Sequence, residues 1–436
     1  MAEILPIRPW RYHPNLLKKI EVLTSPLFDV VSEKQRKALY QNPFNSIHLS
    51  VPQGPDAATR AASILHDWKQ NGVIIQDRIP GIYVYYQHFK LSGDPKPHCR
   101  KGFICHVRTY DWSEKVILRH ENTIPKAVND RVALLEKTEL QSSPTHGLYT
   151  DPGFELENYM DEAMADPIAE TEDYQGVRDV LAVIQDAAII EKFVGLLRDK
   201  TIILADGHHR YEGSLIHKKN MLEKFPGETK RGFNYHLMYF TNTESGDLRI
   251  LPTHRLIKDL PAFDESKIVH KLQEDFTVMP VEDCDTLNEI IAGKPWAFGI
   301  IMKENCYKIK LKPESFHKLS WPFPEVVKKL DLTVMHYFIL EKVLGIPGKL
   351  QRQSVNLEFD RSYSDCLKKV IEGEAQMALI TNEISIEEVK DVCQSGYTMP
   401  QKSTYFYPKV IGGFLFTSIK DEEFQEPVYS PFYHET

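Results

Sequence analysis

The segment TIILADGHHRYEGSL, residues 201–215, places two adjacent histidines, an aspartate and an arginine between an apolar run and a predicted helix. The apolar run predicts a short buried strand, and Gly207 permits a tight backbone turn into the helix. The first N–H groups of a helix have no acceptor inside it, and together with the helix dipole they attract an anion. The junction therefore predicts a site for a phosphate or a carboxylate.

The side chains at this junction point to the same chemistry. Arg210 offers a fork of donors that suits phosphate or carboxylate oxygens. His208 and His209 can donate to anionic oxygens or transfer a proton near neutral pH. Asp206 could accept a proton or hold a divalent cation. These residue types in this order are typical of phosphate binding or phosphoryl transfer.

Other interpretations of the junction are open. Asp206 could cap the helix, and one histidine could be a buried, hydrogen-bonded residue. His208 and Glu212 lie four residues apart on one helical face, as metal ligands often do. We favour anion chemistry over metal ligation, and metal ligation over a purely structural role, because a cap needs one special residue and this segment has five in a row.

A second set of chemically competent residues lies upstream, in RHENT (119–123) and NDR (129–131). His120 and Glu121 could form an acid–base pair, and Asp130 and Arg131 could be an ion pair facing the same cleft. Each of these pairs, taken alone, is more often a salt bridge or a solvated surface.

Two further segments carry donors for an anion. LPTHRLI (251–257) places Arg255 at the end of an apolar run. MPQKSTYFYPK (399–409) offers a cation and two hydroxyls on a proline-flanked loop, namely Lys402, Ser403 and Thr404. The alternative is a surface loop whose aromatic residues pack inward.

The composition excludes several classes of protein. The chain has 436 residues, 42% of them hydrophobic and 26% charged, with a formal net charge of −8. This balance argues against nucleic acid as a partner, because phosphate backbones need a basic face. No apolar run approaches the ~20 residues of a membrane span. The N-terminal residues lack a signal-peptide pattern, so we expect a cytoplasmic protein.

The six cysteines are scattered without a C-x-x-C pair, and we expect reduced thiols. The motifs of P-loop, dinucleotide-binding, zinc-protease and serine-hydrolase enzymes are missing from the sequence.

Hydrophobic spacing and turn residues predict an α+β or mixed α/β protein. Helices are expected over 32–42 (with Ser32 as its N-cap), 57–72, 130–140, 208–225 and 385–395. Strands are expected over 45–54, 81–91, 101–110, 202–205, 234–242 and 248–257, with 178–199 part strand and part helix. The proline- and carboxylate-rich stretch 142–176 is the candidate linker or lid. We expect an N-terminal α+β domain (1–150), a core with the D-G-H-H-R motif (151–260) and a C-terminal α+β domain packing on that core (261–436).

The string ADGHHRYE resembles the signature of a bacterial and archaeal family known as a domain of unknown function, numbered ten-fifteen. SPLFDVVS, NPFNSIHL, RHENT with NDR, SPTHGLY, LPTHRL, LDLTVMHYFIL and MPQKSTYFYPK match the same family, from about residue 4 to 416. The sequence departs from the family's common PPYDVI form at residues 27–29, although Asp29 is kept.

The D-G-H-H-R motif is also similar to that of free-serine kinases with a ParB/sulfiredoxin-like fold. This resemblance implies a kinase core of that fold and phosphorylation of free L-serine to O-phospho-L-serine, with Mg²⁺ and a phosphate donor. Asp206, His208, His209 and Arg210 match the kinase motif. The base glutamate of those kinases lies upstream and does not align here, so Glu121 is a candidate on chemical grounds only. His120 and the hydroxyl-rich loop belong to the wider family's pattern.

We therefore expect a small-molecule phosphotransferase. Gly207 and Arg210 would hold phosphate, His208 and His209 would orient it or protonate the leaving group, and Asp206 or Glu121 would take the hydroxyl proton or bind Mg²⁺. The donor could be pyrophosphate, ATP or ADP, and the lack of a nucleotide motif favours pyrophosphate. The alternatives are a metal-assisted phosphate-ester hydrolase using His208 and Glu212, and a non-catalytic ParB-like binding module. The oligomeric state is open.

Overall fold

The computed structural model describes residues 1–26, 33–91, 94–400 and 402–424, and these form two compact units. Unit 1 contains residues 1–119, 123–248 and the chain from 408 onward, and unit 2 contains residues 120–122 and 249–407. The bounds of the three expected domains do not coincide with these units, because residues 1–150 and 151–260 contribute strands to one sheet.

Unit 1 is built on a mixed nine-stranded sheet. From edge to edge its strands are β6 (Ile117–Arg119), β11 (Ile202–Asp206), β8 (Thr145–Tyr149), β12 (Tyr235–Asn242), β5 (Asp94–Arg108), β4 (Ile82–Leu91), β10 (Arg178–Ile184) and β9 (Ala169–Glu172), with β1 (Ile4–Leu5) paired to β5. β11 pairs in parallel with β6, and β12 with β8, while the other neighbours are antiparallel. The mixed pairing confirms the expected mixed α/β class.

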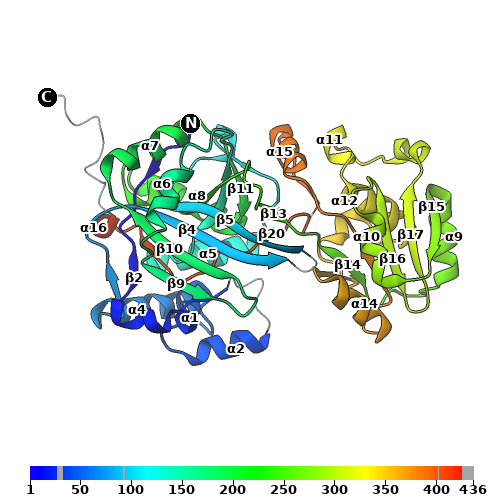
Figure 1. Cartoon of the computed structure of the whole chain (residues 1–436), viewed down its shortest axis with the longest axis horizontal. Coiled ribbons are helices and arrows are strands. Elements are labelled where there is room, and N and C mark those ends of the chain that lie inside the picture. The colour runs from blue at the N-terminus through cyan, green and yellow to red at the C-terminus, as the bar shows by residue number, and fades with distance from the viewer. Residues whose placement is uncertain (27–32, 92–93, 401, 425–436) are drawn as a thin grey trace. The chain divides into compact units, whose positions relative to one another are not determined.

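Both faces of this sheet are covered, as the alternation of side chains in its strands requires. Val84 and Phe103 belong to a core cluster that includes α7, whereas Tyr85 and Ile104 belong to the opposite cluster, which includes α4. In Figure 1, α6 and α7 lie on one side of β4 and β10, and α1 and α4 lie on the other. The helices of unit 1 are α1 (Ile20–Leu23), α2 (Glu33–Gln41), α3 (Ile47–Ser50), α4 (Ala57–Gln70), α5 (Pro125–Thr138), α6 (Glu157–Ala163), α7 (Ala187–Arg198), α8 (His208–Lys224) and α16 (Asp421–Phe424). Short two-stranded pairs join β2 (Trp10–Tyr12) to β3 (Ile74–Gln76) and β7 (Leu140–Gln141) to β21 (Thr417–Ser418).

Unit 2 has an antiparallel six-stranded sheet with helices on both faces. Its strand order is β15 (Phe276–Val281), β17 (Cys306–Leu311), β16 (Ala297–Met302), β19 (Met377–Ile380), β14 (His254–Ile257) and β18 (Leu357–Asp360), and β13 (Arg249–Ile250) pairs separately with β20 (Phe406–Tyr407). Its helices are α9 (Glu265–Asp275), α10 (Leu287–Ile291), α11 (Glu325–Lys328), α12 (Asp331–Val334), a π-helical segment (Met335–Val343), α13 (Gly348–Gln351), α14 (Tyr363–Ile371) and α15 (Ile386–Ser395).

Two predictions about local structure are wrong. Residues 47–50 form the one-turn helix α3 instead of a strand, because the Asn45 side chain accepts a hydrogen bond from the Ile47 N–H and closes a local turn. The stretch 142–176 is not a linker, since β8 lies between β11 and β12 with all five residues buried. Ser32 and Asp29 lie outside the described residues.

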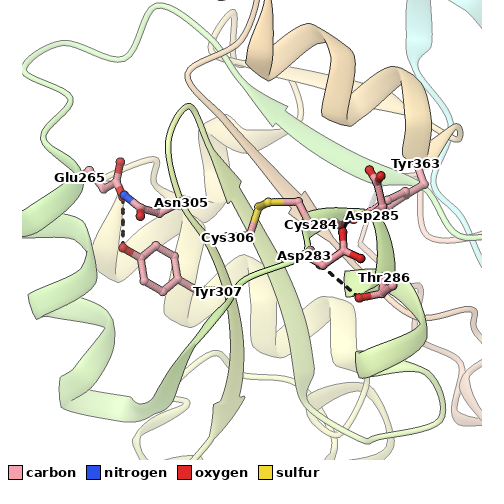
Figure 2. The surroundings of a disulfide bond; sticks show 9 residues. All are labelled: Glu265, Asp283, Cys284, Asp285, Thr286, Asn305, Cys306, Tyr307 and Tyr363. Atoms are coloured by element: carbon pink, nitrogen blue, oxygen red, sulfur yellow. Dashed lines mark hydrogen bonds between the residues drawn. A yellow bond between two sulfur atoms is a disulfide. The ribbon is translucent and has the colours of Figure 1, made fainter.

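The prediction of reduced thiols is wrong for one pair. Cys284 and Cys306 form a disulfide in unit 2 (Figure 2), while the other four cysteines are free. Antiparallel pairing places Val281 of β15 opposite Cys306 of β17, so the turn after β15 returns Cys284 to the same place. Sequence spacing alone could not reveal this contact. In the part of the chain that the structure describes, no helix is long and apolar enough to cross a membrane.

Counting reactive thiols tests the disulfide. Alkylation of the denatured, unreduced protein should add four groups by mass spectrometry, and reduction should raise the number to six. Because the bridge spans 22 residues, Cys306→Ser should lower the free energy of unfolding by about 3 kcal/mol. Cys366→Ser, at a buried free cysteine, is the control. Six groups before reduction would show that the bridge does not form.

Candidate functional site

The D-G-H-H-R segment lies where the sequence predicts, at the junction between a buried strand and a helix. β11 ends at Asp206 and α8 begins at His208. Gly207 has a φ of +90°, and a Cβ added there would lie 2.5 Å from Cγ2 of Thr145. The turn therefore needs glycine for both its conformation and its close contact with β8.

Asp206 is held between two cations. Its Oδ2 accepts a hydrogen bond from Nη2 of Arg210 at 3.1 Å, and its Oδ1 pairs with Nζ of Lys409. Burial alone would raise the pKa of Asp206, but the charges of Lys409 and Arg210 outweigh it and hold that pKa well below its usual value. Asp206 is thus ionised and fixed in place.

Arg210 also ties the junction to the loop before β8. Its Nη1 donates to the Ser143 hydroxyl at 2.8 Å and to the Pro144 carbonyl at 2.7 Å. The guanidinium therefore positions the junction as well as adding charge to it. Its predicted contact with a phosphate stays a prediction.

The two histidines occupy the first turn of α8, which contains no acidic residue. His208 is buried, and its charge would lower the pKa of Asp206 further. Nε2 of His209 accepts a hydrogen bond from the Ile124 N–H, with 3.0 Å between the two nitrogens. This contact assigns the imidazole proton of neutral His209 to Nδ1. Basic side chains at the positive end of a helix dipole favour an anion nearby.

Arg131 of α5 faces the same junction. Its Nη1 donates to the Ser50 carbonyl at 2.6 Å. Burial lowers the pKa of its guanidinium, and the charge of Arg210 lowers it further. α5 and α8 pack closely, with the Cβ position of Gly213 3.1 Å from Cβ of Arg131. The structure therefore brings Arg131 towards the D-G-H-H-R segment, while its predicted binding of a substrate or phosphate stays a prediction.

Arg100 is a residue that sequence reasoning missed. It is fully buried on β5, where its Nη2 donates to Oε1 of Gln87 and to the Pro408 carbonyl, and its guanidinium lies 5.6 Å from the ring centroid of Tyr239. Its Nε and Nη1 have no hydrogen-bond partner among the described residues. Leaving such donors unpaired in the interior is costly, so this guanidinium favours a bound anion or ordered water.

Asp179 lies on the other side of Gln87. Register places Gln87 opposite both Arg100 and Asp179, so the three side chains form a row across β5, β4 and β10. Oδ1 of Asp179 accepts from Nε2 of Gln87 at 2.8 Å and from the Tyr85 hydroxyl. Burial raises the pKa of Asp179 to about 7, so this carboxyl is partly protonated near neutral pH.

Positive charge exceeds negative charge in this region of unit 1. Lys409 and Arg210 act on Asp206, Arg100 acts together with Lys409 on His146, and Arg131 acts on Arg210. Against these four cations stand two carboxylates, Asp206 and Asp130, the second of which acts on Arg131. Burial lowers the pKa of His146 well below its usual value, and the charges of Arg100 and Lys409 act in the same direction. The imidazole of His146 is therefore neutral. An added anion would balance the excess positive charge.

The remaining predicted residues gather in unit 2. Nε2 of His120 lies 2.7 Å from the Thr404 hydroxyl, and Nη2 of Arg255 donates to the Lys402 carbonyl at 3.4 Å. The Ser403 hydroxyl donates to the Pro400 carbonyl. The structure thus joins three of the predicted segments, RHENT, LPTHRLI and MPQKSTYFYPK, although two of these three contacts have a backbone carbonyl as the acceptor.

The described residues do not favour Asp206 as a ligand for Mg²⁺. Both of its oxygens are paired with cations. Across the described ranges, no group of three or more His, Cys, Asp or Glu side chains could hold a metal. Glu212, the metal-ligand candidate beside His208, instead accepts a hydrogen bond from the Trp112 indole at 2.8 Å.

Comparison with known proteins identifies a family for most of the chain. The family described as "Protein of unknown function (DUF1015)" matches residues 4–333. No curated protein matches the sequence.

Three solved structures resemble the fold at low identity. A free serine kinase in complex with AMP is 14% identical, with a TM-score of 0.37, covering 74% of this chain and 93% of its own. A conserved hypothetical protein from Pyrococcus furiosus is also 14% identical, with a TM-score of 0.37. The match covers 74% of this chain and 97% of the Pyrococcus chain. C-terminally truncated SbnI from Staphylococcus aureus is 12% identical, with a TM-score of 0.34, covering 71% and 85%. Similarity at this level does not determine the activity of this chain.

The buried carboxyl of Asp179 predicts a pH dependence of stability. Because its folded-state pKa is raised from 3.8 to about 7, the stability it contributes is complete below pH ~4 and is lost as pH rises through 7. Asp179→Asn cannot ionise and so does not lose this stability. The free energy of unfolding of the variant minus that of the natural protein should therefore increase from pH 4 to 7 and then level off. Urea denaturation at several pH values measures it. Asp166→Asn, at an exposed position, controls for loss of one negative charge. A constant difference across this range would contradict the assignment.

Proposed function

This chain belongs to the DUF1015 family, and we propose that it is a small-molecule phosphotransferase that phosphorylates free L-serine. The observation that carries the proposal is the excess of positive charge around Asp206 at the N-terminus of α8. Phosphoryl transfer depends mainly on positioning and on stabilising negative charge, and this junction supplies donors and cations for both. Phosphate oxygens are the ligands that best match this arrangement.

In the proposed reaction, the serine hydroxyl oxygen forms a bond to the transferred phosphorus. The bond from that phosphorus to the bridging oxygen of the donor breaks, and the rest of the donor leaves. The products are O-phospho-L-serine and the shortened donor. The donor is pyrophosphate, ATP or ADP, and Mg²⁺ enters as the donor's counterion.

The contacts of each residue support distinct roles at this site. Arg210 and the first turn of α8 hold the transferred phosphate. Nδ1–H of His209 donates to it, because Nε2 is already used as an acceptor. Asp206 orients Lys409 and Arg210, since a carboxylate with a strongly lowered pKa is a weak base. Within unit 1, that leaves His208 or the donor's own phosphate to accept the hydroxyl proton.

Phosphorus NMR of the purified full chain tests the proposal. The protein is incubated with L-serine and Mg²⁺, and separately with pyrophosphate, ATP or ADP. A phosphoserine signal with one donor is expected, and it identifies that donor. Inorganic phosphate released equally with and without serine would instead support the metal-assisted hydrolase. No product with any donor would overturn the proposal.

Two variants test the role of the charged junction. Asp206→Asn and Lys409→Met should each lower kcat by about 10²–10³-fold, the usual effect of removing one charge-stabilising group. Lys192→Met, at an exposed position on α7, is the matched control for Lys409→Met and should leave kcat unchanged. Circular dichroism verifies folding. Unchanged kcat in both junction variants would exclude Asp206 and Lys409 from the reaction.

A further inference from the structure

A cavity of about 710 Å³ lies in unit 2, and all the residues that line it belong to that unit. Its lining comes from residues 121–122, 321–359 and 397–400. Pockets of several hundred cubic ångströms bind small organic ligands and cofactors. None of the unit 1 residues assigned to the phosphoryl transfer lines this cavity.

Two segments with chemically competent residues meet at its wall. Nδ2 of Asn122 donates to the Thr398 hydroxyl at 2.8 Å, and the Met399 N–H donates to the His120 carbonyl at 2.8 Å. Arg352 joins them by donating to the Asn122 carbonyl at 3.0 Å. Residues far apart in the sequence are therefore tied together around one space, which is typical of a built binding site.

Aromatic rings supply flat apolar surface to this cavity. Trp321, Phe323, Phe359 and Tyr397 all line it. Trp321 is held in place by Gly348, whose added Cβ would lie 2.5 Å from Cζ2 of the indole. Tyr397 is 46% exposed, so its ring is accessible to a ligand. Such rings stack on nucleobases without needing a particular base.

His336 adds a hydrogen-bond acceptor to the same wall. Nε2 of Gln351 donates to the carbonyls of His336 and Ile346, both at 2.9 Å. Its Oε1 therefore accepts a hydrogen bond from Nδ1–H of His336 at 2.9 Å. Nε2 of His336 then carries a lone pair and has no hydrogen-bond partner among the described residues. Burial lowers the pKa of this imidazole to about 3, so it stays neutral. An amino group on a ligand would complement it.

Charged groups at the cavity match the other parts of a nucleotide. Lys349 and Arg352 are exposed cations that line it and can bind a phosphate. Glu121 and Glu341 also line it, and carboxylates commonly accept hydrogen bonds from ribose hydroxyls. Rings, acceptor, carboxylates and cations together select one class of ligand.

We propose that this cavity binds a nucleotide whose base carries an amino group. The base stacks on Tyr397 and Trp321 with its amino group directed at His336, and the phosphate binds Lys349 and Arg352. This site is distinct from the Asp206 junction, and the proposal does not depend on which donor, if any, is used there.

Calorimetric titration of the full chain with four probes tests the site. AMP and adenosine should bind, AMP more tightly, and adenosine should bind at least about fivefold more tightly than inosine, which lacks the amino group. Tryptophan should not compete. Failure of both AMP and adenosine to bind, equal binding of inosine, or displacement of AMP by tryptophan would overturn the proposal.

Surface variants test which residues form the site. Tyr397→Ala should weaken AMP and adenosine alike by about tenfold, the effect of losing one stacking ring. Lys349→Ala with Arg352→Ala should weaken AMP about tenfold and leave adenosine unchanged. Leu350→Ala and Lys303→Ala are exposed controls in the same unit that do not line the cavity. If the affinity for AMP is unchanged in both sets of cavity variants, AMP binds elsewhere and the proposal is overturned.

Asp206→Asn separates this inference from the proposed function. The variant should lose phosphoserine formation and keep its affinity for AMP. Loss of AMP binding in Asp206→Asn would assign the nucleotide to unit 1 and overturn the cavity proposal. If the natural protein binds AMP in a way that depends on Tyr397 but forms no phosphoserine, the cavity proposal stands and only the kinase proposal is overturned.

Discussion

The pairing of Asp206 with Lys409 and Arg210 is the constraint on which the site in unit 1 depends. Asp206 and Lys409 are 203 residues apart in the sequence, so their contact joins the strand–helix junction to the returning C-terminal segment. The same segment supplies the Pro408 and Lys409 carbonyls to Arg100 and Gln87. One short piece of chain therefore completes both the ion pair and the buried polar row.

That pairing also decides what Asp206 can do. An isolated carboxylate at the end of a strand is a reasonable base or metal ligand. Held between two cations with a lowered pKa, it becomes a fixed negative charge that organises its neighbours. The cations retain an excess positive charge, and the start of α8 adds the helix dipole to it. The balance favours an anionic ligand beside Asp206 over a metal bound to it.

The candidate site in unit 2 is formed by different interactions from those in unit 1. Its cavity relies on aromatic surface and on an imidazole whose neutral tautomer is fixed by Gln351. The disulfide between Cys284 and Cys306 connects the turn after β15 to β17 (Figure 2), and Glu265 holds Asn305 and Tyr307 beside it. The site in unit 1 therefore depends on buried charge, whereas the cavity in unit 2 combines aromatic rings with exposed cations.

The sequence by itself determined the features that depend on neighbouring residues. Gly207, the apolar run before it and the helix after it follow from local turn chemistry and periodicity, as do α4, α5 and the β4–β5 pair. Tertiary structure alone decided the contacts between distant segments. The sequence around Arg100 and Lys409 does not predict their burial, because an arginine in a strand or a lysine in a loop usually lies at the surface. Only the folded sheet and the returning C-terminal segment cover these two side chains. The same holds for β8, whose burial comes from its two neighbours, and for the Cys284–Cys306 bridge, which strand register creates.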